Sequence, residues 1–184
     1  MIRILTTLFL IFIPILANAT AWQIEPKDSS LTFTATQNNS PVTGQFKSFT
    51  GDINFDPNQL STSNVNIVID TGSVTASYKE VGDTLKTPDW FDVKLFPQAV
   101  FKATQFKKID DKTYQASGNL TIRDKTIPTT LSFVLDEYTP TKAHVTGTAT
   151  LQRLAFGIGK GDWAKTDDVK DDVKINFILS ASKK

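Results

Sequence analysis

The sequence contains no cysteine, one methionine and one histidine, and these absences exclude several kinds of chemistry. Without cysteine there is no disulfide framework. The thiolate ligands usual for zinc or haem are absent, and only one imidazole is present. No Gly-x-Ser-x-Gly elbow, phosphate-binding loop or dinucleotide fingerprint occurs. We therefore expect a protein that is stabilised by packing, requires no cofactor and is not an enzyme.

Charge of one sign is also lacking, because 20 basic residues stand against 19 acidic ones. A neutral, unpatterned surface argues against nucleic acid as a partner. The one histidine, His144, falls on the polar side of its predicted strand, where we expect a solvated side chain. Asp83, Asp89 and Asp92 are the only carboxylates beside a predicted aromatic pocket, and an acid–base pair would be sought among them if the protein were a hydrolase.

Residues 1–19 have the features of a secretory signal peptide. Arg3 precedes an apolar run from Ile4 to Leu16, and Ala17-Asn18-Ala19 offers a small-x-small cleavage site. The run is too short to span a membrane, and no cysteine follows it for lipid attachment. We expect an exported protein in which residues 20–184 form one domain.

The stretch from Tyr114 to Asp136 shows the pattern that recurs along the chain. On each side of a break at 123–126, small or apolar residues alternate with polar ones: Tyr114, Ala116, Gly118, Leu120 and Ile122, then Ile127, Thr129, Leu131, Phe133 and Leu135. Side chains on a strand point alternately to opposite faces, so this predicts an antiparallel hairpin with one apolar face. With Ile122 opposite Ile127, Gly118 would face Leu131 and Ala116 would face Phe133.

Similar alternation predicts about eight or nine short strands over almost the whole chain. Two of the longer segments switch parity, one near Lys47-Ser48 and the other near Gln152-Arg153. A switch of this kind predicts a bulge or bend, which coils a sheet toward closure.

One segment departs from the alternation. Ser77 and Glu80 match a capping box, and Tyr78, Val81 and Leu85 have helical spacing, which predicts a short helix over 77–86 before Pro88. A sandwich and a barrel are both open, and the long bent strands together with this helix favour the barrel. An eight-stranded barrel is just wide enough to be filled by its own side chains or to hold one small ligand.

An ordered set of short motifs runs through the chain after residue 20. They are Trp22-Gln23-Ile24-Glu25-Pro26, Ser29-Ser30-Leu31-Thr32-Phe33, Gly44-Gln45-Phe46, Ser73-Val74-Thr75, Pro88-Asp89-Trp90-Phe91-Asp92, Phe96-Pro97-Gln98-Ala99-Val100-Phe101, Gly118-Asn119-Leu120-Thr121-Ile122, Arg153, Phe156-Gly157-Ile158-Gly159, Trp163 and Val173. Together they resemble the YceI-like family of polyisoprenoid-binding proteins. The resemblance implies an all-β, eight-stranded antiparallel, lipocalin-like barrel with one short helix. It also implies a periplasmic protein that holds a long isoprenoid lipid, such as a ubiquinone or a polyprenyl tail.

The sequence departs from that family at two places where many members carry histidine, since Asp28 and Thr84 stand there. Headgroup contacts made by those histidines cannot be transferred to this chain. Residues 34–37 and 159–163 resemble the branch sometimes fused to membrane cytochromes of the b561 type. This implies a quinone as ligand and such a cytochrome as a partner.

Strand parity and the aromatic cluster after the helix together select candidate ligand-binding residues. Trp90 and Phe91 are candidates for an entrance or plug, and the inner wall is predicted to consist of Phe33, Ile67, Ile69, Leu120, Leu131, Phe133, Val145, Ile175 and Phe177. Two rivals remain: a solid barrel acting in stress or protein interaction, and a lipid-modifying enzyme. A free strand edge could pair two subunits into a homodimer, and nothing in the sequence decides this.

Overall fold

The computed structural model describes residues 21–184, so the predicted signal peptide lies outside the described residues. These described residues form one antiparallel sheet with a single α-helix, α1 (Lys79–Leu85). The strands are β1 (Ala21–Ile24), β2 (Ser30–Gln37), β3 (Ser40–Phe46), β4 (Phe49–Asn54), β5 (Asn64–Asp70), β6 (Val74–Ala76), β7 (Gln98–Lys108), β8 (Thr113–Ile122), β9 (Lys125–Tyr138), β10 (Lys142–Gln152) and β11 (Asp172–Lys183). Five 3₁₀ turns connect them: η1 (Pro26–Asp28), η2 (Leu60–Thr62), η3 (Thr71–Ser73), η4 (Arg153–Phe156) and η5 (Gly161–Ala164).

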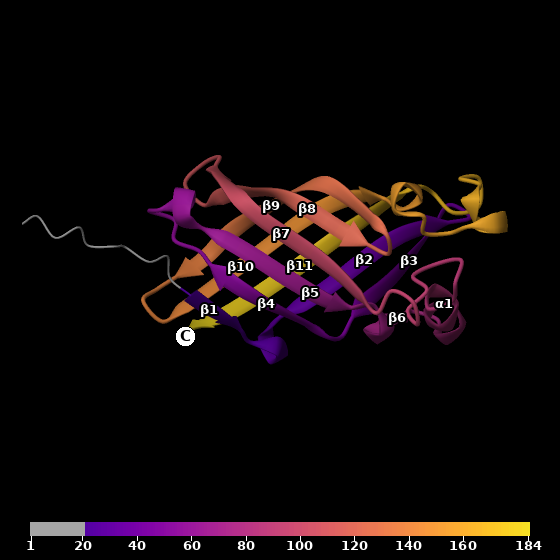
Figure 1. Cartoon of the computed structure of the whole chain (residues 1–184), viewed down its shortest axis with the longest axis horizontal. Coiled ribbons are helices and arrows are strands. Elements are labelled where there is room, and N and C mark those ends of the chain that lie inside the picture. The colour runs from indigo at the N-terminus through magenta and orange to yellow at the C-terminus, as the bar shows by residue number, and fades with distance from the viewer. Residues whose placement is uncertain (1–20) are drawn as a thin grey trace, which may run out of the picture.

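The sheet closes into a barrel because β1 pairs with both β4 and β11. Strands β1 and β2 lie end to end along β11, with η1 between them. The pairs β3/β4 and β5/β6 are likewise long strands interrupted once. Counted in this way, the eleven segments form an eight-stranded antiparallel barrel, as predicted, and the sandwich is excluded (Figure 1).

The break between β3 and β4 confirms the predicted bend at Lys47-Ser48. Phe46 ends one strand and Phe49 begins the next, so both side chains turn to the interior despite their opposite parity. The second switch of parity has a different cause. Strand β10 ends at Gln152, and Arg153–Phe156 form the turn η4, so no bulge continues the strand there.

The β8–β9 hairpin has a different register from the predicted one. Its turn consists of two residues, Arg123 and Asp124, and Ile122 pairs with Lys125. Leu120 therefore faces Ile127, Ala116 faces Leu131, and Tyr114 faces Phe133. The inward side of each strand is unchanged, because the shift between the predicted and observed pairing is two residues.

Large rings lie over glycines on neighbouring strands, which allows the barrel wall to fit. Phe33 pairs with Gly44, and a Cβ at Gly44 would lie 2.2 Å from the tip of the Phe33 ring. Phe177 stands in the same relation to Gly147, at 2.1 Å. Any larger residue at either glycine would displace the aromatic ring.

Helix α1 is shorter than predicted and begins without the capping box. The hydroxyl of Ser77 lies 2.6 Å from that of Thr43 and donates to the Thr43 carbonyl, so it does not cap the helix. Val81 and Leu85 pack against the core from this helix, as their spacing predicted. Figure 1 shows α1 and the loop that carries η4 and η5 at the same end of the barrel, far from β1 and the C-terminus.

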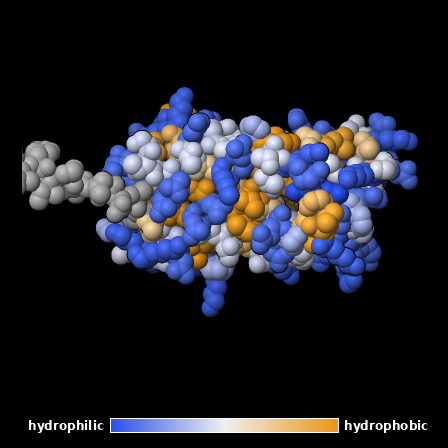
Figure 2. Space-filling view, in the orientation of Figure 1, coloured by the Kyte–Doolittle hydropathy of each residue, from blue (hydrophilic) through white to orange (hydrophobic). Residues whose placement is uncertain are grey.

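The face of the molecule shown in Figure 2 is mainly polar, with apolar residues between the polar ones. His144 lies on the outer side of the barrel, where its Nδ1 is 2.8 Å from the Ser180 hydroxyl. Within residues 21–184 no helix is long and apolar enough to cross a membrane. In the same part of the chain, no three His, Cys, Asp or Glu residues lie together in a way that could hold a metal ion.

Candidate functional site

The half of the barrel nearest α1 encloses a cavity of about 330 Å³. Its wall is formed by residues of β2, β3, β4, β5, β7, β8, β9, β10 and β11, and the helix covers it from the end. The register explains how these residues meet: Phe33 lies between Ile175 and Gly44, and Ile67 pairs with Phe101. The wall is almost entirely carbon, because its polar residues are only Thr32, Gln37, Glu80, Thr84 and Arg153.

The cavity reaches the surface between α1 and the end of β2. Glu80 is exposed to solvent and also lines the cavity, so it marks the opening. Thr84, one turn further along the helix, and Gln37, at the end of β2, are half-buried and line the cavity too. Hydrogen-bonding side chains are thus concentrated at this end, and apolar ones fill the rest of the wall.

Two connecting segments form the cover of the cavity, and we call them the cover segments: residues 79–96, which contain α1, and residues 153–170, which contain η4 and η5. The amides of Gly159 and Lys160 both donate to the Asp89 carbonyl at 2.8 Å. The rings of Trp90 and Trp163 meet at 5.5 Å between centroids. The two segments are therefore joined to each other above the barrel.

Arg153 organises the second cover segment. Its side chain is 3% exposed and donates to the carbonyls of Ile158, Val169 and Lys170, at 3.0, 2.8 and 3.1 Å. Burial lowers the pKa of the guanidinium, and the charge of Asp171 opposes that change. The guanidinium also lies 5.7 Å from the Trp90 ring centroid, which links it to the first cover segment.

The glycines that follow Arg153 allow the chain to fold around it. Gly157 and Gly159 have φ angles of +68° and +82°, which suit glycine best. A Cβ at Gly159 would lie 2.1 Å from Arg153 Nη1. The glycine-rich stretch 157–161 therefore has a structural role, because it lets the backbone pack closely around the Arg153 side chain.

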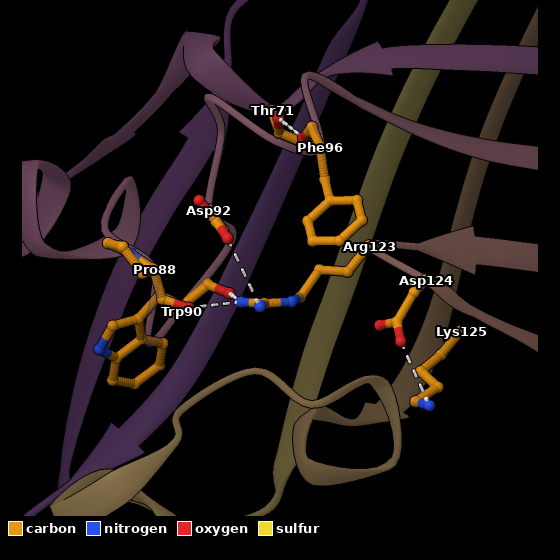
Figure 3. Close-up of polar contacts among 8 residues, drawn as sticks. All are labelled: Thr71, Pro88, Trp90, Asp92, Phe96, Arg123, Asp124 and Lys125. Carbon is orange, nitrogen blue, oxygen red and sulfur yellow. Dashed lines mark hydrogen bonds and ion pairs between the residues drawn. The ribbon is translucent and has the colours of Figure 1, made fainter.

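Arg123, at the β8–β9 turn, holds the first cover segment (Figure 3). Its Nη1 donates to the carbonyls of Pro88, at 2.8 Å, and of Trp90. Its Nη2 lies 3.8 Å from an Asp92 carboxylate oxygen, and the guanidinium stacks on Phe96 at 5.2 Å. Figure 3 shows the Arg123 side chain extending from the β8–β9 turn to the backbone beside Trp90.

The opposite half of the barrel is filled. Tyr114 and Phe133 stack at 5.6 Å with an angle of 18° between the rings, and Phe55 contacts both rings at 5.7 and 5.8 Å. Phe106 lies 5.5 Å from Phe55, and the Trp22 indole donates to the Phe55 carbonyl at 2.9 Å. None of these rings lines the cavity, so within residues 21–184 we call this half filled and the half nearest α1 hollow.

Most of the sequence-predicted wall residues lie around the cavity. Nine of the eleven line it: Phe33, Ile67, Ile69, Trp90, Phe91, Leu120, Leu131, Ile175 and Phe177. The other two, Phe133 and Val145, face the interior but lie in the filled half, so their predicted place on the cavity wall is corrected. Inward parity is the same for both groups, and what separates them is the packing across the barrel.

Several cavity residues were not selected from the sequence. Strand parity was signal enough to find Leu31, Leu151 and Leu179, and helical spacing was enough to find Val81 and Leu85. The positions of Gln37 and Glu80 at the opening and the roles of Arg123 and Arg153 had no such signal. They depend on where the ends of distant strands meet.

Comparison with known proteins supplies the family. The model of the YceI-like domain matches residues 22–181. The chain belongs to the YceI-like family. A UPF0312 protein of Vibrio vulnificus is 30% identical over 154 residues, which cover 79% of this chain and 82% of that protein. A UPF0312 protein of Pseudomonas putida is 29% identical over 142 residues, covering 74% and 73%.

Solved structures of related proteins share the fold. BcnA of Burkholderia cenocepacia is 29% identical and superposes with a TM-score of 0.81 over 85% of this chain and 98% of that one. A polyisoprenoid-binding domain from Saccharophagus degradans, implicated in plant cell wall breakdown, gives 0.69 at 14% identity over 90% and 99%. The lipocalin-like barrel of the sequence prediction is thereby confirmed.

Proposed function

We propose that this protein binds an isoprenoid lipid, with the tail in the cavity and the headgroup at the opening, and acts as a carrier in the periplasm. The observation that carries the proposal is the almost wholly apolar wall of a cavity that opens beside Gln37, Glu80 and Thr84. A concave apolar site with a few polar groups at one end suits an amphipathic ligand. The polyisoprenoid-binding domain among the structural neighbours supports this choice of ligand.

The energetics favour a carrier that exchanges lipid with a membrane. Each CH₂ group removed from water contributes about 0.8 kcal/mol, so a prenyl tail would bind tightly if water were the alternative. The actual competitor is a bilayer, which is equally apolar. The net preference must therefore come from packing against the wall and from the polar groups at the opening, and a modest preference permits release.

The finer parts of the proposal rest on the sequence. The predicted signal peptide supports the periplasm, and the resemblance of residues 34–37 and 159–163 to the b561-associated branch supports a quinone ligand and a membrane cytochrome as partner. The side-chain amide of Gln37 at the opening suits the oxygen atoms of a quinone ring, because its NH₂ group can donate to them. The Thr84 hydroxyl already donates to the Glu80 carbonyl at 2.8 Å, so it is not counted as a donor to the ring. Ring oxygens placed there would leave the tail in the apolar part of the cavity.

Within residues 21–184, the cavity offers few side chains that could catalyse a reaction on the lipid. The cavity wall contains no histidine and no serine, and the carboxylates considered for a hydrolase do not face it. Asp83 and Asp89 are exposed, and Asp92 is beside Arg123. We therefore propose binding without chemistry.

Two neighbouring positions on β9 give a matched test. Leu131 lines the cavity, whereas Thr130 points outward and its hydroxyl lies 3.0 Å from that of Ser117. Protein purified without detergent should yield an isoprenoid when it is extracted with organic solvent and the extract is examined by mass spectrometry. Leu131→Asp should lose this lipid, because a carboxylate in the wall opposes an apolar tail, and Thr130→Asp should keep it. Equal lipid content in the two variants, or no lipid in the wild type even after incubation with a prenol, would refute the proposal.

A further inference from the structure

On three strands of the barrel the cavity ends between two consecutive inward-facing residues. On β9, Leu131 lines it but the next inward residue, Phe133, does not. On β5, Ile67 lines it but Val65 does not, and on β7 the boundary falls between Phe101 and Ala103. An end that is shared by separate strands is a floor that crosses the barrel.

The floor is made of aromatic rings: Phe55, Phe106, Tyr114 and Phe133, which we call the aromatic floor. Phe55, Tyr114 and Phe133 are 6%, 3% and 8% exposed, and each touches the other two. Interlocked rings in a close-packed interior yield little, since any shift of one requires the others to move. A tail that enters from the α1 end therefore meets a rigid stop.

The volume above the floor is small for a long polyprenyl chain. At about 330 Å³ it is roughly twice the ~150 Å³ apolar cavity that takes up one benzene molecule. By that ratio it accommodates about a dozen carbon atoms, or about two to three isoprene units.

The depth agrees with the volume. The residues of β11 on the wall run from Val173 to Leu179. At about 3.3 Å a residue and a strand tilt of about 40° to the barrel axis, this corresponds to about 15 Å. Only a short tail fits in extended form, and the rest of a longer one would remain outside the opening near Glu80.

We infer that the aromatic floor fixes the length of the prenyl tail and makes this protein selective for short isoprenoids, of farnesyl size, over long polyprenyl chains. The inference rests on the proposed function and names the ligand class within it. Phe133 is the residue that sets the limit, because it is the first ring below the wall on β9. Its truncation should join the space beneath Leu131 to the cavity.

The experiment is a competition among prenols of different length. The purified protein, stripped of lipid, is incubated with an equimolar mixture of farnesol, geranylgeraniol and solanesol in one detergent, separated by gel filtration, extracted and analysed by mass spectrometry. Phe133→Ala should raise the ratio of retained solanesol to farnesol by about tenfold over the wild type, because a longer part of the solanesol tail can then pack inside the barrel. Phe133→Leu should shift the ratio in the same direction by less, which covers the case in which the alanine variant does not fold.

Two further variants complete the design. Ala149→Phe adds a ring to the cavity wall and should reduce retention of all three prenols, solanesol most. Ile178→Ala removes an apolar side chain from the outer face and should leave the ratio unchanged. The detergent's own preference for long chains cancels, because each variant is compared with the wild type in the same mixture.

The outcomes separate the two proposals. If the wild type retains none of the prenols, the proposed lipid-binding function fails and the inference fails with it. If the wild type retains prenols but both Phe133 variants keep its ratio, the function stands and the floor does not set the length. Retention of solanesol by Ala149→Phe at the wild-type level would also overturn the inference.

Discussion

The two halves of the barrel interior are built from the same strands and the same inward-facing pattern, yet one is hollow and the other is filled. In the hollow half, branched aliphatic residues such as Ile67, Leu120 and Ile175 stand along the wall and leave the axis free. In the filled half, Phe55 reaches the rings of Phe106, Tyr114 and Phe133 across the axis. The strands supply a frame common to both halves, and the halves differ in whether aromatic rings meet across the axis.

The largest expected effect compares one phenylalanine from each half. Phe55 and Phe101 are 6% and 5% exposed, but Phe55 is surrounded by rings and Phe101 faces the cavity. Phe55→Ala should reduce the free energy of unfolding by about 3–5 kcal/mol. Phe101→Ala should reduce it by about 2 kcal/mol, because fewer packed neighbours are lost beside an existing void. Urea unfolding followed by tryptophan fluorescence measures both, and equal losses would mean that the halves are packed alike.

A second comparison sets the buried arginine of the cover against an exposed lysine on the same segment. Arg153→Lys should cost about 3 kcal/mol of unfolding free energy, because an ammonium group cannot reach the carbonyls that the planar guanidinium serves. Lys165→Ala, at an exposed position of the same loop, should change it by less than about 0.5 kcal/mol. Chemical denaturation gives both values. If Arg153→Lys left the free energy of unfolding unchanged, the second cover segment would be held in place by other contacts.

A third comparison uses two glycines with positive φ in that segment. At Gly159 (φ +82°) a Cβ would meet Arg153 Nη1, whereas at Gly161 (φ +61°) it would meet nothing within 4 Å. Gly161→Ala should lower the free energy of unfolding by about 1 kcal/mol, because only the backbone conformation is strained. Gly159→Ala should cost about 2 kcal/mol or more, since the arginine must also move. Thermal unfolding of the two variants gives their relative stabilities. If Gly161→Ala were the less stable variant, Gly159 would not be needed to make room for the Arg153 side chain.

The smallest expected effect lies on the surface of α1. Lys79 Nζ is 2.6 Å from an Asp83 oxygen, and this hydrogen bond and the lysine charge lower the pKa of the carboxyl. A lowered pKa stabilises the fold above the carboxyl's unfolded pKa, and the contribution is lost as the pH falls through the folded value. Both groups are exposed and screened, so Asp83→Asn should leave stability unchanged within error. A clear drop at neutral pH but not at pH values below the carboxyl's titration would contradict this.

Strand parity was sufficient to predict the closed sheet and the inner faces, because burial of one side repeats at every second residue. It also located the bend between β3 and β4, since Phe46 and Phe49 can both face inward only if the strand breaks there. It did not give the β8–β9 register, because Arg123-Asp124 lacks the Asn-Gly or Asp-Gly pair typical of two-residue turns. The capping box failed for a tertiary reason, since Thr43 engages the Ser77 hydroxyl.

Strand parity could not predict which half of the barrel interior is hollow and which is filled. Leu131 and Phe133 are consecutive inward residues of one strand, and nothing local distinguishes their roles. The difference arises where Phe55, from the end of β4, meets Phe133 from β9, and such contacts between distant segments depend on the closed barrel. The roles of Arg123 and Arg153 could not be predicted either, because their main partners are backbone carbonyls that carry no signal in the sequence.

The most direct test of the hollow half as a lipid site is a crystal structure of the protein loaded with farnesol. Continuous elongated density should run from the opening at Glu80 and Thr84 along Phe33 and Ile175, and should end above Phe133. A cavity that holds only ordered water, or one in which the wall residues have closed over the axis while farnesol lies elsewhere, would contradict the account.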